Sequence, residues 1–174
     1  TSGVWQIILN PARVVEGQYD LWLPSENVLN RGTGFLYPDE EVTLTIPSTA
    51  DKVISVGAYD ALTFSYASFS GRGYTWQDER TKPDLVAPGV NVKTTAVGGG
   101  VTVVSGTSFA TPFVTGASAL LMEWGIVRGN DPFLYGEKVK AYLRRGAREL
   151  PGFGRYPNRE VGYGRLCLER SLPD

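Results

Sequence analysis

A helix that is small and apolar on almost every side constrains the fold of this chain more than any other feature. Residues 109–123 combine small residues such as Gly116 and Ala117 with larger apolar ones such as Leu120. Because a helix without a polar face has no side that favours water, this helix is predicted to be buried in a domain core. A short apolar strand at 101–104 and a tight turn lead directly into it, which gives a strand, a turn and a buried helix in succession.

The pattern after residue 50 contains further strand and helix signals. Residues 53–58 form an apolar run that is typical of a buried strand in a parallel sheet, and residues 90–92 predict another short strand. Asp131 and Pro132 have the residue types of an N-cap and a first helical position, so they predict the start of a second helix. The fold class that follows is α/β with a parallel sheet.

The second helix is predicted to be amphipathic. Its apolar face is lined by Val139, Tyr142, Leu143 and Ala147. Its basic residues are predicted to lie mainly on a solvated face, as a charge run usually does, and they are Lys138, Lys140, Arg144, Arg145 and Arg148.

Residues 1–47 have a residue pattern that is typical of β structure. Segments 4–9, 18–23 and 42–46 are rich in strand formers or alternate polar with apolar residues. Turn signals separate them. This resembles part of a sandwich or jelly roll, in which Trp5 and Trp22 are expected to be core residues. The open edges of so few strands need covering, so further strands are expected before Thr1.

Composition excludes several classes of partner. The chain has 174 residues, 42% of them hydrophobic, 20% charged, and a net charge of −1. That size suits one compact domain, and that charge gives no reason to expect nucleic acid or an anionic membrane as partner. No apolar run approaches the roughly 18 residues that span a bilayer. The chain begins without an initiator Met, so we expect it to be part of a longer protein.

The absence of histidine limits the chemistry that this chain performs alone. Histidine is the commonest general base near neutral pH and the commonest metal ligand, and the chain contains none. The single cysteine, Cys167, has no partner for an internal disulfide. No cluster with metal-ligand spacing exists, so no metal and no cofactor are expected. Any nucleophile here needs a base from elsewhere.

Ser108 is the candidate nucleophile, because it stands where the tight turn meets the buried helix. The first backbone N–H groups of a helix have no partner within it, and the helix dipole favours negative charge beside them. The Ser108 N–H is therefore placed to donate to the oxyanion of a tetrahedral intermediate. Taken alone, a serine at a helix start is most often a structural cap.

A longer match favours the chemical interpretation. Residues 105–116 resemble the nucleophile motif of the subtilisin-like proteases, Gly-Thr-Ser-x-Ala-x-Pro followed by a Gly in the helix. Four further segments are similar to this family in the right order: 53–58, 67–73, 82–89 and 162–166. The resemblance covers about residues 48–168. It implies that the fold includes the C-terminal part of a subtilisin-like parallel-sheet domain.

The resemblance implies roles for few residues. Ser108 is implied as the nucleophile and as the backbone oxyanion donor, while Gly106 and Thr107 shape the turn. The catalytic Asp and His of the family precede the Ser along the chain, and this sequence has neither. The early carboxylates have no matching motif and are interpreted as turn or surface groups: Asp20, Asp39, Asp51 and Asp60. The asparagines that lack the Gly-Asn context of the second oxyanion donor are Asn10, Asn27 and Asn30.

Residues 1–47 look like the jelly-roll insertion of the subtilases of clostridial spore germination, the Csp type. That likeness implies a partner protein as substrate, such as the precursor of a cortex-degrading enzyme, and favours an extracellular or spore-associated location. The domain prediction is therefore an incomplete jelly-roll-like segment at 1–47 and the C-terminal part of a subtilase catalytic domain at 48–174.

The predicted function is that of a serine endopeptidase that hydrolyses protein substrates by acyl-enzyme chemistry. This chain is predicted to supply the nucleophile without the Asp and His, and to be inactive alone. The alternatives are a pseudoprotease, and a binding or structural module built on residues 1–47. Because half of an α/β domain exposes open sheet edges, we expect a partner: the N-terminal part of the same protease, or another copy of the chain.

Overall fold

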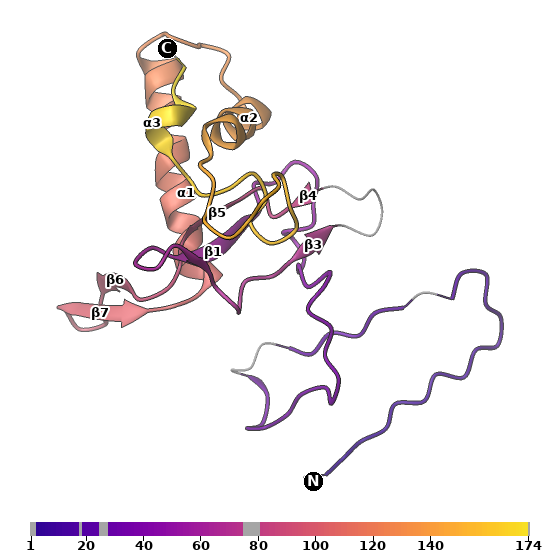
Figure 1. The fold of residues 1–174 in the computed structure, drawn as a ribbon. Coiled ribbons are helices and arrows are strands. Elements are labelled where there is room, and N and C mark those ends of the chain that lie inside the picture. Colours follow the sequence, from indigo (N-terminus) through magenta and orange to yellow (C-terminus); the bar gives the residue numbers. More distant parts are fainter. Residues whose placement is uncertain (1–2, 18, 25–27, 75–80, 174) are drawn as a thin grey trace. The chain divides into compact units, whose positions relative to one another are not determined.

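The computed structural model describes residues 3–17, 19–24, 28–74 and 81–173. The chain divides into two compact units, Thr1–Pro38 and Asp39–Asp174 (Figure 1). The second unit holds all the named strands and helices, and its first residue lies nine positions before the boundary predicted from sequence.

The first unit differs from the β structure that its sequence predicts. Among its described residues none lies in a strand, so the predicted strand 4–9 and the described part of 18–23 are wrong. Extended backbone forms a strand only when a neighbour pairs with its N–H and C=O groups, and these residues supply no such neighbour. Without a sandwich interior, Trp5 and Trp22 are 75% and 56% exposed rather than buried. The jelly-roll assignment stays a prediction.

The predicted strand 42–46 is also absent, although this segment belongs to the second unit. Val42 has a φ of 53°, which strand residues do not adopt. The Thr43 N–H instead donates to the Arg72 carbonyl at 2.9 Å, and the Arg72 N–H donates to Thr43 Oγ1 at 2.9 Å. Side-chain and backbone bonds to one distant residue therefore replace a strand ladder here.

The central sheet is built on two parallel strands, β1 (Val56–Asp60) and β5 (Leu85–Pro88). Val56 stands opposite Leu85, and Tyr59 opposite Pro88. The short strand β2 (Ser65–Tyr66) pairs antiparallel with the end of β1. The predicted parallel strand is thus confirmed, although it begins at residue 56 rather than 53.

Two antiparallel hairpins stand beside this sheet. The first joins β3 (Gly73–Tyr74) to β4 (Thr81–Lys82). The second joins β6 (Val92–Thr95) to β7 (Val101–Val104). The second turns at Gly98, Gly99 and Gly100, whose φ angles are 84°, 104° and 83°. Glycine adopts such positive φ angles without a Cβ clash, which explains the glycine run.

Helix α1 (Thr107–Met122) continues into a π-helical segment, η2 (Glu123–Val127). Helices α2 (Gly136–Gly146) and α3 (Leu168–Ser171) follow and pack on each other and on α1 (Figure 1). The predicted start of the second helix is wrong, because α2 begins five residues after Asp131. The Asp131 carboxylate accepts side-chain bonds from Lys138 at 2.6 Å and Tyr142 at 3.0 Å.

The core forms where α1 crosses β1 and β5. Four residues spaced along one face of α1 are buried, namely Ala110, Val114, Ala117 and Leu121. They pack in one cluster with Ala58 of β1, Leu85 of β5, and Val139 and Leu143 of α2. Val139 and Leu143 were predicted for the apolar face of the second helix, and their burial confirms that prediction.

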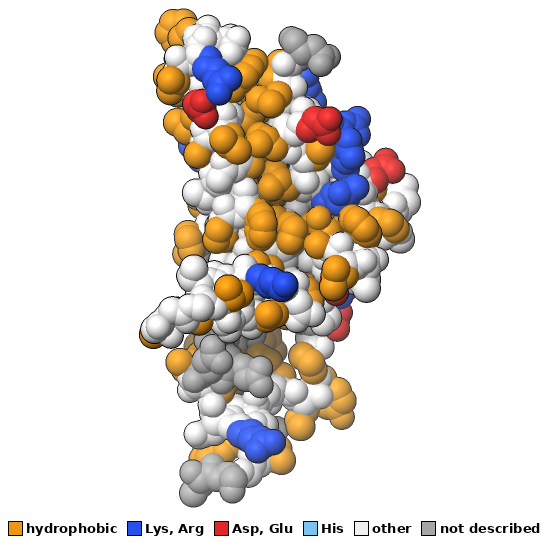
Figure 2. All heavy atoms as spheres, turned by 90° about the vertical axis from the view of Figure 1, so that its left-hand side faces the viewer, with side chains coloured by type: hydrophobic (Ala, Val, Ile, Leu, Met, Phe, Trp, Pro, Cys, Tyr) orange, Lys and Arg blue, Asp and Glu red, His pale blue; other side chains and the backbone are white. Residues whose placement is uncertain are grey.

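The rest of the α1 surface is mostly exposed, and large apolar side chains flank the buried stripe on both sides. Phe113, Leu120 and Met122 are 44%, 52% and 43% exposed. Figure 2 views the molecule from the left-hand side of Figure 1 and shows hydrophobic side chains across that side of the molecule. The prediction of a helix buried on all sides is therefore confirmed for one face only.

The 21 residues of α1 and η2 form a helix long and apolar enough to cross a membrane by length and composition alone, which the sequence analysis did not predict. Its inner face is nevertheless packed on a sheet through Val114 and Leu121. Such packing is that of a core helix in a globular domain.

Candidate active site

Ser108 lies in the first turn of α1, at the end of the parallel strands where ligands of α/β folds commonly bind. Gly89, which directly follows β5, donates its N–H to the Tyr59 carbonyl at the end of β1 at 3.0 Å. The Gly89 carbonyl in turn accepts the Gly106 N–H at 2.8 Å. These two bonds fix the entrance of α1 to both strands.

Gly106 makes the sharp turn before the helix, with φ 152° and ψ 156°. Gly89 is also required by space, because a Cβ there would lie 2.6 Å from Ala58 Cβ and 3.1 Å from the Gly106 carbonyl oxygen. The turn therefore requires glycine at 106 because of its φ, and the close approach of strand and helix entrance requires glycine at 89.

The Ser108 side chain is exposed, and its backbone N–H stands in the first helical turn, where N–H groups have no acceptor one turn earlier. The Phe109 N–H already donates to the Gly106 carbonyl at 3.0 Å. No side chain caps this helix start, so Ser108 is not the capping residue that a common serine at this position would be. An exposed hydroxyl beside an open helix N-terminus can attack a carbonyl and hold the resulting oxyanion.

A hollow of about 280 Å³ opens beside Ser108. One wall comes from the entrance of α1, through Thr107, Ser108 and Thr111. The other wall comes from the chain before and at the start of β1, through Pro47, Ser48, Val53, Ile54 and Val56. Four of these eight residues are apolar, four carry hydroxyl groups, and none is charged.

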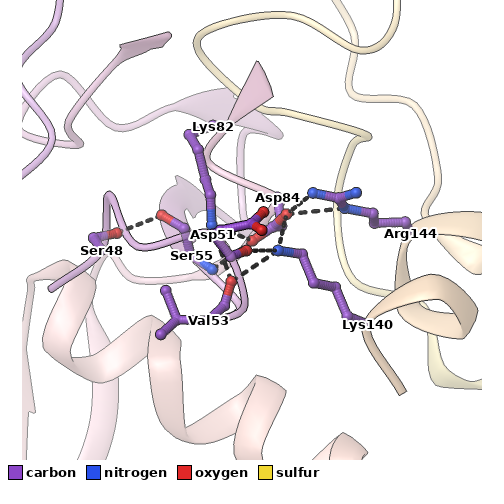
Figure 3. A network of polar contacts seen from close by, with 8 residues as sticks. All are labelled: Ser48, Asp51, Val53, Ser55, Lys82, Asp84, Lys140 and Arg144. Carbon is purple, nitrogen blue, oxygen red and sulfur yellow. Dashed lines mark hydrogen bonds and ion pairs between the residues drawn. The ribbon is translucent and has the colours of Figure 1, made fainter. Parts of the chain in front are cut away.

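Behind the second wall lies a network of polar contacts around Asp84 (Figure 3). Asp84 is fully buried. Its Oδ2 accepts the Ser55 N–H at 2.6 Å and the Lys82 ammonium at 3.2 Å. Its Oδ1 accepts Arg144 Nε at 2.9 Å and lies 3.4 Å from Lys140 Nζ. One carboxylate thus faces three cationic side chains.

Lys140 and Arg144 correct the predicted solvated face of α2. Lys140 is 8% exposed, and Arg144 is half-buried with its guanidinium 4.9 Å from the Tyr163 ring centroid. Both turn inward because the buried Asp84 carboxylate needs positive partners. Burial lowers the pKa of Lys140, since loss of water disfavours its charged form, while the charge of Asp84 acts in the opposite direction.

The two lysines also hold the backbone of the hollow's wall. Lys140 Nζ donates to the Asp51 carbonyl at 2.7 Å and to the Val53 carbonyl at 2.9 Å. Lys82 Nζ donates to the same Val53 carbonyl at 2.9 Å. The hydroxyls of Ser55 and Ser48 hydrogen-bond each other, which connects the network to a residue that lines the hollow.

Two of the early carboxylates, Asp39 and Asp60, accept backbone hydrogen bonds from the residue two positions later, as expected for turn residues. Asp39 Oδ1 accepts the Glu41 N–H at 2.9 Å, and Asp60 Oδ1 accepts the Leu62 N–H at 2.8 Å. Across the described parts of the chain, His, Cys, Asp and Glu side chains do not gather in groups of three or more that could hold a metal. Cys167 is free and half-buried.

A model of the subtilase family matches residues 36–164, which include the turn, Ser108, the hollow and the Asp84 network. The chain belongs to the subtilase family. The resemblance to subtilisin-like proteases inferred from the motifs is thereby confirmed, as is the α/β fold with its parallel strands.

The solved CspB protease of Clostridium perfringens is 50% identical to the chain, with a TM-score of 0.78 over 82% of this chain and 30% of that one. The prenylagaramide maturation protease PagA is 32% identical, with a TM-score of 0.62 over 76% of this chain and 46% of that one. The likeness to a Csp-type protease is thereby confirmed, whereas the jelly-roll insertion at 1–47, from which it was inferred, is not shown.

Curated relatives include the serine protease AprX of Bacillus subtilis, 35% identical over 78% of this chain and 33% of AprX. The membrane-bound transcription factor site-1 protease of Mus musculus is 38% identical over 74% of this chain and 12% of its own length. The chain therefore spans about a third or less of the curated relatives named here.

Sequence reasoning found Ser108 and missed the residues that support its surroundings. Asp84 was matched to the family within segment 82–89 but was assigned no partner. The available signal was a charged residue directly before the apolar run Leu85–Ala87. A carboxylate at the edge of a buried strand needs cations that are also buried.

Proposed function

We propose that this chain supplies the nucleophile of a subtilisin-like serine endopeptidase, and that residues 48–174 are the C-terminal part of its catalytic domain. The observation that carries the proposal is the exposed Ser108 hydroxyl in the first, uncapped turn of α1 beside an open hollow. Membership of the subtilase family supports it.

The chemistry is acyl transfer. Ser108 Oγ attacks the carbonyl carbon of the scissile peptide bond, and its proton passes to a base. The Ser108 backbone N–H donates to the oxyanion that forms. The amine then leaves with a proton from the base, and water hydrolyses the acyl-enzyme. Because the chain contains no histidine, a histidine base has to come from outside residues 1–174, and we assign its carboxylate partner and a second oxyanion donor to the same part of the protease.

A partner covering α1 is part of this proposal. Phe113 and Leu120, two turns apart on one side of α1, are exposed apolar residues on a helix whose buried stripe is core. Exposed apolar surface of this kind marks an interaction site. We assign it to the polypeptide that supplies the base, the N-terminal part of the same protease, with a second copy of the chain as the alternative. The substrate is a protein or peptide, bound as an added strand.

The test is cleavage of a protein substrate by the whole protease carrying Ser108→Ala. The expected loss of kcat is about 1,000-fold or more, because no other group can form the acyl-enzyme. The matched control is Ser118→Ala in the same helix, where the hydroxyl only donates to the Val114 carbonyl at 2.8 Å. Equal cleavage by the Ser108→Ala protein and the wild type would show that another group is the nucleophile, and no cleavage by the wild type would favour a pseudoprotease or binding module instead.

A further inference from the structure

The wall of the hollow opposite Ser108 is held by side chains that do not line it. Its residues Val53 and Ser48 are reached from behind by Lys82, Lys140 and Ser55. Lys140 comes from α2, 87 residues along the chain from Val53. A distant helix therefore determines where this wall stands relative to the nucleophile.

The hydrogen bonds from the two lysines are made to backbone carbonyls, so they do not depend on which side chains line the wall. Lys140 Nζ donates to the backbone carbonyls of Asp51 and Val53, and Lys82 Nζ also donates to the Val53 carbonyl. These hydrogen bonds are partly buried, and a carbonyl that loses such a donor is stabilised by moving toward water or another partner. The path of residues 51–53 is thus tied to the two ammonium groups.

Asp84 fixes both ammonium groups in turn. It lies 3.2 Å from Lys82 Nζ and 3.4 Å from Lys140 Nζ, and it also receives the Ser55 N–H at 2.6 Å. The Lys82 and Lys140 side chains are 2% and 10% exposed. Buried and paired on several sides, these groups have one arrangement, which a positioning device requires.

We propose that Lys140 and Lys82, held by Asp84, are positioning residues that set the wall of the hollow beside Ser108 and so select which substrate side chains it accepts. This rests on the proposed function, because the hollow is taken as part of the substrate site. The lysines touch neither the substrate nor the reacting atoms. The effect of the lysines passes through Val53, and that of Asp84 passes through Ser55 to Ser48.

The first test uses Lys140→Met in the whole protease. Asp84 keeps Lys82 and Arg144 in this variant, so the network remains paired and the protein is expected to fold. Active sites are titrated first, and kcat/KM is then compared for peptides that differ only in the residue before the scissile bond. We expect the preference between small and large side chains to change by about 5-fold or more, because wall position determines discrimination.

Two further variants separate positioning from a loss of stability. Lys140→Arg keeps a donor for the carbonyls and is expected to restore most of the wild-type preference. Lys52→Met is the matched control, because Lys52 is 79% exposed and pairs only at 3.8 Å with Glu137. Ser55→Ala, which removes the bond to Ser48 and keeps the N–H to Asp84, is expected to shift the preference in a second, smaller way.

The same peptides are also titrated as ligands against the non-cleaving Ser108→Ala protein, with and without Lys140→Met. A shift in the ratio of Kd values there supports positioning even if the wild type proves inactive, in which case the proposed function alone fails. A Lys140→Met protein whose preferences stay within about 2-fold of wild type in both assays overturns the proposal. So does a Ser108→Ala protein that binds none of the peptides.

Discussion

Lys82 Nζ lies 3.2 Å from the Asp84 carboxylate, and the two side chains are 2% and 0% exposed to solvent. Breaking such a pair leaves an uncompensated charge in the interior. We expect Asp84→Asn to lower the free energy of unfolding by about 3–5 kcal/mol, measured by denaturant titration.

The control for this substitution is Glu137→Gln, which removes the exposed pair with Lys52. A surface pair of this kind contributes at most about 1 kcal/mol. Equal losses of stability in the two variants would contradict the role assigned to the Asp84 network.

Gly162 approaches the backbone beside that network so closely that it admits no side chain. Its φ is 58°, and a Cβ would lie 2.1 Å from the Pro83 carbonyl oxygen and 2.5 Å from that of Asp84. We expect Gly162→Ala to lower the free energy of unfolding by about 1–3 kcal/mol or to prevent folding, because backbone atoms cannot yield. Gly99→Ala, at a positive φ with open space around it, is expected to lose clearly less in the same titration.

The exposed face of α1 gives a prediction about the assembled protein. If a partner covers Leu120, a charge there is forced into an apolar interface. We expect Leu120→Asp to lower the thermal inactivation temperature of the whole protease and weaken association with its partner. Leu62→Asp, at a turn residue that is 84% exposed, serves as control, and matching behaviour of the two variants would show that α1 is not covered.

Asp131 predicts a dependence of stability on acid pH. The hydrogen bond from Lys138 lowers the pKa of this carboxyl below its ordinary value of 3.8. Because the folded-state pKa is depressed, the unfolded chain binds more protons than the folded chain at pH values between the two pKa values. The stabilisation is therefore present above the ordinary pKa and is lost as the pH falls through the folded-state pKa. We expect wild type to exceed Asp131→Asn in unfolding midpoint at neutral pH, with the difference shrinking as the pH falls below 3.8. A constant difference would exclude the ion pair as its source.

Local patterns were enough to predict the elements that carry the site. The apolar run at 53–58 predicted β1, and the small apolar stretch at 109–123 predicted α1. Both predictions were possible because the apolar residues that bury each element are close together in the sequence. Ser108 was found for the same reason, since the turn and the helix start are adjacent in sequence.

What could not be predicted depends on partners distant in sequence. The strand patterns within 1–47 formed no strands among the described residues, because pairing needs a neighbour that a pattern cannot supply. Arg144 was assigned to a solvated face, and only Asp84, 60 residues away, explains its inward position. The hollow was not predicted, because its lining brings Pro47 and Val56 together with the entrance of α1, which is distant from them in sequence.

The most direct test of the central claim is labelling of the whole protease with a fluorophosphonate, followed by mass spectrometry of its peptides. We expect one modified serine, Ser108, with labelling abolished in Ser108→Ala and retained in Ser118→Ala. Proteolytic activity without label at Ser108, or label that persists in Ser108→Ala, would contradict the assignment of Ser108 as the nucleophile.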